Sequence, residues 1–285
     1  MKIAFLGTGL LGAPMAARLH DAGVRVRAWN RTAARAAPLR ETGVNVVDDV
    51  REAVSGAEAT LLMLADAPAI NTVLATQGVA QALRGQTLVQ MGTIAPGESR
   101  DLANRCTSWG ASYLEAPVLG SIPQAQAGTL QVMVGGDEAL LARWSSLLAH
   151  FGPVRRVGAV GEAATLKLAL NQLIASLTAA FSASLGLVRR EGVDVDLFLD
   201  ILRKSALYAP TFDKKLGRMM ERDFGNPNFP TRHMLKDVNL FLDAANGVGL
   251  GTEGVAGVAR VIEAALKRGV GDLDYSALYV GVDPD

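Results

Sequence analysis

The sequence has 285 residues, 49% of them hydrophobic and 20% charged, which is the range of an ordinary globular protein. Its 28 basic and 28 acidic residues balance, which argues against nucleic acid or an anionic membrane surface as a partner. A single cysteine, Cys106, excludes an intrachain disulfide and a cysteine-based metal cluster. Because a strand pattern starts at residue 2, we expect no signal peptide and a cytoplasmic location.

The chain opens with an apolar run at 2–6, a glycine-rich turn at 7–12 and a helical pattern. Gly7 permits a tight turn, Gly9 lets the backbone approach a pyrophosphate, and Gly12 lets the helix pack against the strand. The N-terminus of the helix adds unpaired N–H groups and a partial positive charge. The pattern predicts a dinucleotide site rather than a glycine-rich turn without a ligand, and its residues are Gly7, Gly9, Leu10, Leu11 and Gly12.

A second strand, at 24–29, ends in Asn30, Arg31 and Thr32. An NAD site usually has Asp or Glu here, which accepts a hydrogen bond from the ribose 2′-hydroxyl. This chain has no such carboxylate, and Arg31 is able to pair with the oxygens of a 2′-phosphate while Asn30 and Thr32 donate hydrogen bonds. We therefore predict NADP(H) over NAD(H). The alternative is that Arg31 is an ordinary solvated arginine.

Short apolar runs alternate with helical patterns through the first 160 residues. Further strands are expected at 44–47, 59–64, 87–91, 111–114, 130–134 and 154–157, and helices at 49–54, 97–107 and 137–149. This alternation predicts a doubly wound α/β sheet, whose early strands are parallel and covered on both faces.

The pattern changes after Gly161. One helical run spans 162–190, Gly192 ends it, and only helical patterns follow, punctuated by prolines at 210, 227 and 230. We expect a Rossmann-type α/β N-terminal domain over 1–161 and an all-α C-terminal domain over 162–285, joined by the long helix.

The segment 168–188 has no charged residue and is long enough to span a bilayer. Polar residues interrupt it, so we expect a buried helix of a soluble protein without membrane contact. Its apolar surface on all sides predicts a homodimer or homotetramer.

Ligands of such sheets lie beyond the carboxyl ends of the parallel strands. Leu64 with Ala65, and Thr93, end two strands in the small or polar residues that a nicotinamide ribose requires. The segment 115–121 ends another strand in a tight turn. Its Gly120 and Ser121 are predicted to offer a backbone N–H and a hydroxyl to a carboxylate.

Lys167 is the only charged residue between Glu162 and Arg189, and Asn171 shares its helix face four residues later. A lone lysine in an uncharged helix is costly to bury without a use. The functional hypothesis is a general acid that protonates a developing alkoxide while hydride attacks a carbonyl, with Asn171 orienting the lysine or the substrate oxygen. A lysine that snorkels to the surface fits the spacing equally well.

The segment 229–237 has a similar character. Lys236 is a candidate to bind a substrate carboxylate or the cofactor. Asp237 is a candidate to fix the position of a neighbouring group, and Phe229 to form an apolar side of the pocket. The alternative is a helix N-terminus with solvated charges. The three histidines show no metal-ligand spacing, so we assign no metal.

Together these motifs resemble the β-hydroxyacid dehydrogenases over essentially the whole chain. The resemblance rests on residues 7–12, Thr93 with Pro96, 115–121 with 128–130, Lys167 with Asn171, and Lys236 with Asp237. It implies a catalytic role for Lys167.

Within that family, the chain most resembles the glyoxylate/succinic semialdehyde reductase branch, through the segments 29–32, 120–121, 229–230 and 271–276. The resemblance implies NADPH-dependent reduction of glyoxylate to glycolate and of succinic semialdehyde to 4-hydroxybutyrate. It also implies substrate roles for Thr93, Ser121, Phe229 and Asp237. The chain departs from the family at Gly92, where serine is usual, and at Leu119, where a smaller or polar residue is common.

Other functions stay open. The family also includes 3-hydroxyisobutyrate dehydrogenase and tartronate semialdehyde reductase, which act on similar small acids. An imine reductase shares the architecture but typically lacks the lysine, and a non-catalytic NADPH-binding module needs no Lys167–Asn171 pair. A 6-phosphogluconate dehydrogenase is disfavoured by the short helical domain. Pocket discrimination between such acids amounts to only ~1–3 kcal/mol per methylene, so the sequence does not name the substrate.

Overall fold

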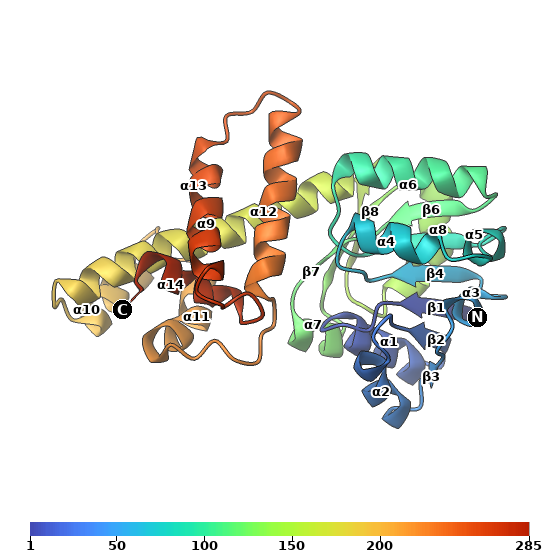
Figure 1. Cartoon of the computed structure of the whole chain (residues 1–285), viewed down its shortest axis with the longest axis horizontal. Helices are drawn as coiled ribbons and strands as arrows, with labels where there is room; N and C mark the ends of the chain where they lie inside the picture. Colours follow the sequence, from blue (N-terminus) through green and yellow to red (C-terminus); the bar gives the residue numbers. More distant parts are fainter. Residues whose placement is uncertain (285) are drawn as a thin grey trace. The chain divides into compact units, whose positions relative to one another are not determined.

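A nine-stranded sheet forms the core of the N-terminal part of the chain (Figure 1). The computed structural model describes residues 1–284. The strands are β1 (Lys2–Leu6), β2 (Arg25–Trp29), β3 (Asn45–Val46), β4 (Ala59–Leu62), β5 (Thr87–Gln90), β6 (Ser112–Glu115), β7 (Val118–Leu119), β8 (Gln131–Gly135) and β9 (Val154–Gly158).

The strand order is β3-β2-β1-β4-β5-β6-β8-β7, with β9 paired to β8. The strands β1 to β6 are parallel, whereas β8 runs antiparallel to β6 and β7 and parallel to β9. The first six strands therefore have the order of a dinucleotide-binding Rossmann fold, as predicted.

Helices cover both faces of this sheet. They are α1 (Gly12–Asp21), α2 (Ala33–Glu41), α3 (Val50–Val54), α4 (Ala67–Leu74), α5 (Val79–Ala82), α6 (Pro96–Ser108), α7 (Ile122–Ala127) and α8 (Glu138–Leu148). Alternate residues of β1 face opposite sides, so Phe5 joins a cluster with α1 and α8, and Leu6 joins a cluster with α4 and α6. This double coverage explains why the early strands are apolar throughout.

All eight expected strands are present, with ends displaced by a few residues. The helices α2, α4, α5 and α7, of nine, eight, four and six residues, were not predicted. The segment 115–121 is not one tight turn, since Val118 and Leu119 form the short strand β7 against β8.

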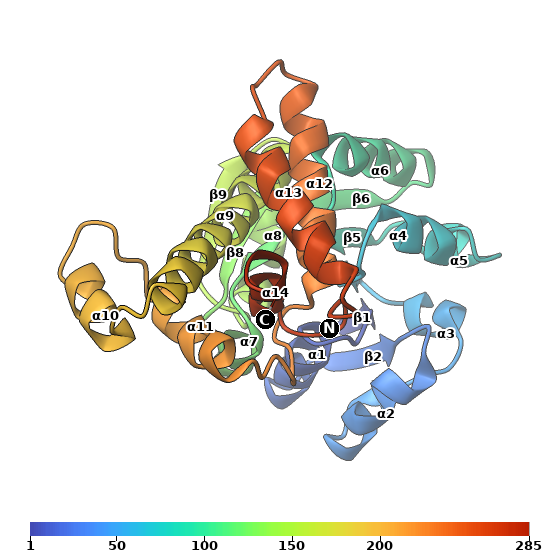
Figure 2. The same ribbon diagram turned by 60° about the vertical axis from the view of Figure 1, so that its left-hand side comes forward.

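The rest of the chain is helical, as predicted. It contains α9 (Glu162–Arg190), α10 (Val195–Arg203), α11 (Pro210–Glu221), α12 (Thr231–Asn246), α13 (Glu253–Leu266), a 3-10 turn (Tyr275–Leu278) and α14 (Tyr279–Val282). Pro210 begins α11 and Pro230 directly precedes α12, positions where the missing N–H of proline costs nothing. The helices α12 and α13 lie side by side (Figure 2).

The chain divides into two compact units, Met1–Lys167 and Leu168–Asp285. The second unit has its own apolar core, in which the rings of Phe181 and Phe212 stack with centroids 4.7 Å apart. The long helix α9 begins in the first unit and contributes most of its length to the second.

Helix α9 is long and apolar enough to cross a membrane by length and composition alone, and it is the one such helix among residues 1–284. Core helices of soluble proteins also reach this length and hydropathy, so these two properties indicate a membrane span only weakly. Of its most apolar 18-residue window, 44% is buried inside the chain.

Candidate functional site

The glycine-rich turn has the geometry that the sequence predicts. Gly7 has φ +102°, and a Cβ there would overlap the carbonyl oxygen of Met63. A Cβ on Gly12 would overlap the carbonyl oxygen of Gly7, so these two glycines are required by the fold itself. A Cβ on Gly9 would meet no atom within 4 Å. Gly9 therefore leaves open space beside the backbone, which suits a pyrophosphate at the start of α1.

The Asn30 side chain forms hydrogen bonds with the backbone of this turn and of the segment after β2. Its Oδ1 accepts the backbone N–H of Thr8 at 3.1 Å, and its Nδ2 donates to the carbonyl of Thr32 at 2.9 Å. The hydroxyl of Thr8 is buried and has no partner within residues 1–284. An unpaired buried hydroxyl in the turn fits a site that a polar ligand completes. Arg31 is exposed just after β2.

Two strand ends meet beside the turn. Leu64 and Ala65 follow β4, and Gly92 and Thr93 follow β5. A Cβ at Gly92 would lie 2.5 Å from the carbonyl oxygen of Leu64. The departure from the usual serine thus has a steric cause, because this backbone leaves no room for a side chain.

Gly120 and Ser121, for which the sequence predicts contacts to a carboxylate, follow β7 directly. Gly120 has φ +141°, which favours glycine, and Ser121 directly precedes α7. The Ser121 hydroxyl lies 2.6 Å from Oε1 of Gln124, and its N–H donates to the same oxygen at 3.0 Å. The N–H and the hydroxyl of Ser121 are therefore both directed at one acceptor, as in a capping box.

Lys167 and Asn171 lie one turn apart on α9 and are 9% and 5% exposed. This burial opposes the snorkelling alternative, in which the lysine head would reach bulk water. A buried ammonium near a polar amide is a suitable proton donor for a developing oxyanion.

Asp237 organises a second polar cluster, in the helical unit. Its Oδ2 accepts a hydrogen bond of 2.6 Å from Nδ2 of Asn171, and its Oδ1 lies 2.7 Å from Nζ of Lys236. Asp237 is 3% exposed, so it is not a solvated charge at a helix end. Phe229 precedes α12 and packs edge-on against Tyr275, with ring centroids 6.0 Å apart.

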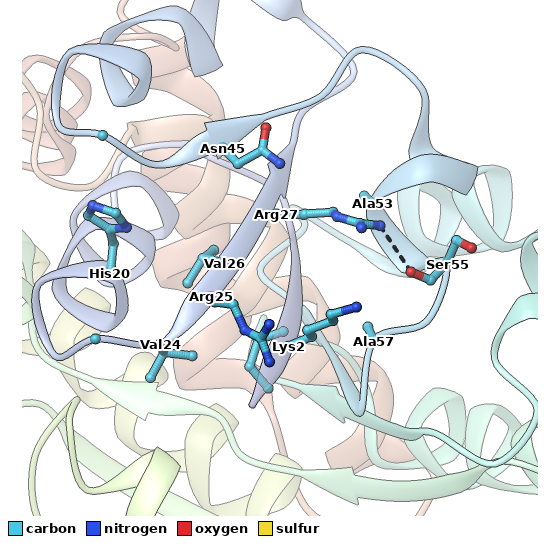
Figure 3. A pocket seen from close by; sticks show the side chains of 13 residues that line it. Lys2, His20, Val24, Arg25, Val26, Arg27, Asn45, Ala53, Ser55 and Ala57 are labelled. Atoms are coloured by element: carbon cyan, nitrogen blue, oxygen red, sulfur yellow. Dashed lines mark hydrogen bonds between the residues drawn. The ribbon is translucent and has the colours of Figure 1, made fainter.

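A cavity of about 410 Å³ lies elsewhere, at the amino ends of β1 and β2 (Figure 3). Lys2, Arg25 and Arg27 line it, and Arg27 donates to the carbonyl of Ser55 at 3.0 Å. No predicted site residue lines it, and it lies at the opposite ends of these strands from the glycine-rich turn. It is therefore not the cofactor site.

Comparison with known proteins decides the family. The family model for the NAD-binding domain of 6-phosphogluconate dehydrogenase matches residues 2–161. The NAD-binding domain of NADP-dependent 3-hydroxyisobutyrate dehydrogenase matches residues 161–281. The chain belongs to the β-hydroxyacid dehydrogenase family.

Relatives match this dehydrogenase over nearly its whole length. Glyoxylate/succinic semialdehyde reductase 1 of Arabidopsis thaliana is 31% identical over 99% of this chain and 98% of that protein. The 2-hydroxy-3-oxopropionate reductase of Escherichia coli is 32% identical over 98% of this chain and 96% of that protein. Among solved structures, 3-hydroxyisobutyrate dehydrogenase of Mycobacterium tuberculosis with L-serine has a TM-score of 0.86 at 28% identity, covering 98% and 97% of the chains.

These findings confirm the resemblance, the Rossmann-type fold with a helical C-terminal part, and an oxidoreductase that uses a nicotinamide cofactor. One buried polar residue of this dehydrogenase, Gln90, was not predicted as part of the site. Both amide atoms of Gln90, the last residue of β5, are buried without a partner among the described residues. A polar residue that ends an apolar strand was the available signal. Within residues 1–284, no three His, Cys, Asp or Glu side chains gather as a metal site requires.

Proposed function

We propose that this dehydrogenase reduces small aldehyde or keto acids with NADPH, including glyoxylate to glycolate and succinic semialdehyde to 4-hydroxybutyrate. The observation that carries the proposal is the burial of Lys167 one turn from Asn171. A nicotinamide cofactor, when bound at the glycine-rich turn, would supply the hydride for the carbonyl carbon. Lys167 then gives its proton to the carbonyl oxygen as the C=O bond becomes a C–O single bond.

NADP(H) is proposed over NAD(H) because residues 30–32 include no carboxylate and Arg31 is exposed. A guanidinium at this point pairs with a 2′-phosphate, and an Asp or Glu would repel it. The residues assigned to the cofactor are Gly7, Gly9, Leu10, Leu11, Gly12, Asn30, Arg31, Thr32, Leu64, Ala65, Thr93 and Lys236.

The substrate carboxylate is assigned to the donors of Gly120 and Ser121, and Thr93 is assigned to the substrate as well. Asn171 and Asp237 orient the reacting end, and Phe229 supplies an apolar wall. A second candidate is reduction of 2-hydroxy-3-oxopropionate, the tartronate semialdehyde, which the name of the Escherichia coli relative favours. This acid carries the same carboxylate and aldehyde, so it makes the same demands on these groups.

The test is NADPH oxidation with glyoxylate, succinic semialdehyde, 2-hydroxy-3-oxopropionate and a cyclic imine, with NADH in parallel. We expect turnover of the acids with NADPH and none of the imine. Lys167→Ala is expected to lower kcat by about 10²–10⁴-fold, the usual contribution of a positioned acid. Lys214→Ala, an exposed lysine on α11, is the matched control. Near-normal turnover of Lys167→Ala would remove Lys167 from its role, and silence on all substrates with NADPH bound would reject the substrate class.

We also propose a homodimer or homotetramer that covers the exposed stripe of α9. Leu166, Leu173 and Leu187 are 38%, 48% and 65% exposed. They follow a seven-residue spacing, which places them on one side of the helix. Sedimentation velocity should give a multiple of the monomer mass, and Leu173→Glu should lower it. A monomer at micromolar concentration would refute the assembly.

A further inference from the structure

Glu115, the last residue of β6, has a buried carboxylate at the start of the long helix. The residue is 1% exposed. Its Oε1 accepts the backbone N–H groups of Gly161 and Ala163 at 2.8 Å each and of Ala164 at 3.4 Å. These N–H groups lie at the start of α9, where a helix lacks internal acceptors and carries partial positive charge. A side chain from the sheet thus caps the helix that bears Lys167.

The other carboxylate oxygen is fixed from the opposite side. Ser99 Oγ donates to Glu115 Oε2 at 2.5 Å and lies 2.7 Å from the hydroxyl oxygen of Tyr113. A serine hydroxyl has one proton, so Tyr113 is the donor to Ser99. Burial raises the pKa of Tyr113 well above its usual value, which keeps that proton in place. The hydrogen bonds therefore run in one direction: Tyr113 donates to Ser99, and Ser99 donates to Glu115.

Gly135 makes room for this carboxylate. Glu115 pairs with Gly135 on β8, and Gly135 pairs with Gly158 on β9. A Cβ on Gly135 would overlap Glu115 Oε1. The carboxylate is thus confined between three strand ends and the first turn of α9, and it has little freedom to shift.

The capped turn is the one over which Lys167 extends. Ala163 and Ala164 precede Lys167 by four and three residues, so they lie directly below it on the helix surface. Helical side chains lean toward the N-terminus, over the preceding turn. Any displacement of this first turn therefore moves the Lys167 side chain with it.

We propose that Glu115 is a positioning residue, which fixes the first turn of α9 at the sheet edge and so sets the place of the Lys167 ammonium. The inference rests on the proposed role of Lys167 as the proton donor.

The experiment compares Glu115→Gln with Glu115→Asp and with a matched control. Glutamine keeps the length and removes the charge, and aspartate keeps the charge and shortens the reach by one methylene. Asp137→Asn is the control, because Asp137 caps α8 by accepting the N–H of Leu140 at 3.0 Å. We expect both Glu115 variants to lower kcat by roughly 10- to 100-fold, as misplacement by about 1 Å does. We expect the Kd for NADPH to stay unchanged and Asp137→Asn to keep its kcat.

A second readout separates positioning from folding. Hydrogen exchange of the amides at 161–164 should accelerate in Glu115→Gln under conditions where Asp137→Asn leaves them protected. A Glu115→Gln variant that fails to fold would show fast exchange throughout the sheet. In that case Ser99→Ala replaces it, because this variant keeps the Glu115 carboxylate and removes one of its donors. We then expect the same lower kcat and the same faster exchange at 161–164 in Ser99→Ala.

The double variant decides whether Glu115 acts through Lys167. If it does, Glu115→Gln lowers kcat in the wild-type background and has no further effect on the residual rate of Lys167→Ala. An equal loss in both backgrounds, or a kcat no lower than that of Asp137→Asn, overturns the inference while Lys167 keeps its role. Wild-type turnover of Lys167→Ala alone overturns the proposed function instead.

Discussion

Asn171 on α9 donates a hydrogen bond of 2.6 Å to Asp237 on α12, and the second oxygen of the same carboxylate lies 2.7 Å from the ammonium of Lys236. Asp237 is buried; its Oδ2 accepts the Asn171 hydrogen bond, whereas its Oδ1 has the Lys236 ammonium close by but no hydrogen-bond partner within residues 1–284. The carboxylate thereby fixes the direction of the Asn171 amide, which follows Lys167 by one helical turn. This arrangement explains why an acidic residue belongs in a site proposed to bind acids, since its charge is already engaged.

Replacing Asp237 should therefore impair turnover in a graded way. In Asp237→Asn the amide oxygen still accepts from Asn171, but Lys236 loses its counter-charge. In Asp237→Ala the buried amide of Asn171 also loses its acceptor, at a cost of about 1–3 kcal/mol. Steady-state kinetics should give kcat/KM in the order wild type, Asn, Ala. Asp243→Asn, an exposed carboxylate on the same helix, should match wild type. An alanine variant as active as wild type would remove Asp237 from the site.

Restoring the family's usual serine at position 92 should harm this enzyme. The added Cβ would lie 2.5 Å from the carbonyl oxygen of Leu64, so the end of β4 must move. Leu64 and Ala65 are assigned to the cofactor, and we expect Gly92→Ser to raise the Kd for NADPH in a fluorescence titration. Gly97→Ala is the control, because nothing lies within 4 Å of a Cβ there. Unchanged NADPH affinity in Gly92→Ser would show that the two strand ends adjust freely.

The sequence predicted the features that depend on local chemistry. The turn from Gly7 to Gly12 needs glycines for reasons of backbone geometry, and that need is visible without a structure. The long helix 162–190 was predicted at its observed bounds, because no glycine or proline breaks it before Gly186 and charged residues flank its apolar length. Lys167 was conspicuous as the only charge within that length.

The remaining features depend on contacts between segments far apart in the sequence. The bond from Asn171 to Asp237 joins residues 66 positions apart, and the bonds from Glu115 to α9 span nearly 50. No spacing rule connects such residues. The pairing of Ser121 with Gln124 is local and was still missed, because α7 was not predicted. The exclusion of a side chain at Gly92 required the position of the Leu64 carbonyl, which only the folded backbone provides.

Cys106 should be unreactive in the folded protein. Burial raises the pKa of its thiol from 9.0 to about 12, with Arg105 opposing the shift weakly. Only the thiolate is alkylated, so iodoacetamide at pH 8 should modify Cys106 slowly in buffer and rapidly in urea. Rapid labelling in buffer would contradict the burial.

The same shift makes stability depend on pH. Between pH 9 and about 12 the folded chain keeps a proton that the unfolded chain releases, so this contribution is complete below pH 9 and is lost as pH rises. Cys106→Ala should show a shallower loss of unfolding free energy over that range. An identical slope in wild type and variant would contradict the shift.

Lys215 and Asp274 form a buried ion pair, with Nζ and Oδ1 2.8 Å apart and side chains 8% and 0% exposed. Asp274 also accepts the N–H and hydroxyl of Ser276, at 3.1 and 2.8 Å. Burial alone would raise the pKa of Asp274, but the Lys215 and Ser276 hydrogen bonds outweigh it and hold that pKa below its ordinary value. Removing the carboxylate leaves a buried ammonium without its counter-ion, so Asp274→Asn should lower the free energy of unfolding by about 3–5 kcal/mol. The double variant Lys215→Met/Asp274→Asn should lose less, because no charge is then stranded.

Urea unfolding at several pH values checks this. Since the folded pKa of Asp274 is depressed, its contribution is present above the unfolded value near 3.8 and is lost as pH falls through the folded value. The gap between wild type and Asp274→Asn should therefore be full at pH 7 and narrow below pH 3.8. Asp200→Asn is the exposed control: its partner Lys204 lies 2.7 Å away with 73% of its side chain exposed, and the loss should stay within about 1 kcal/mol. A single variant at Asp274 that costs no more than this control would show that the buried pair adds nothing to stability.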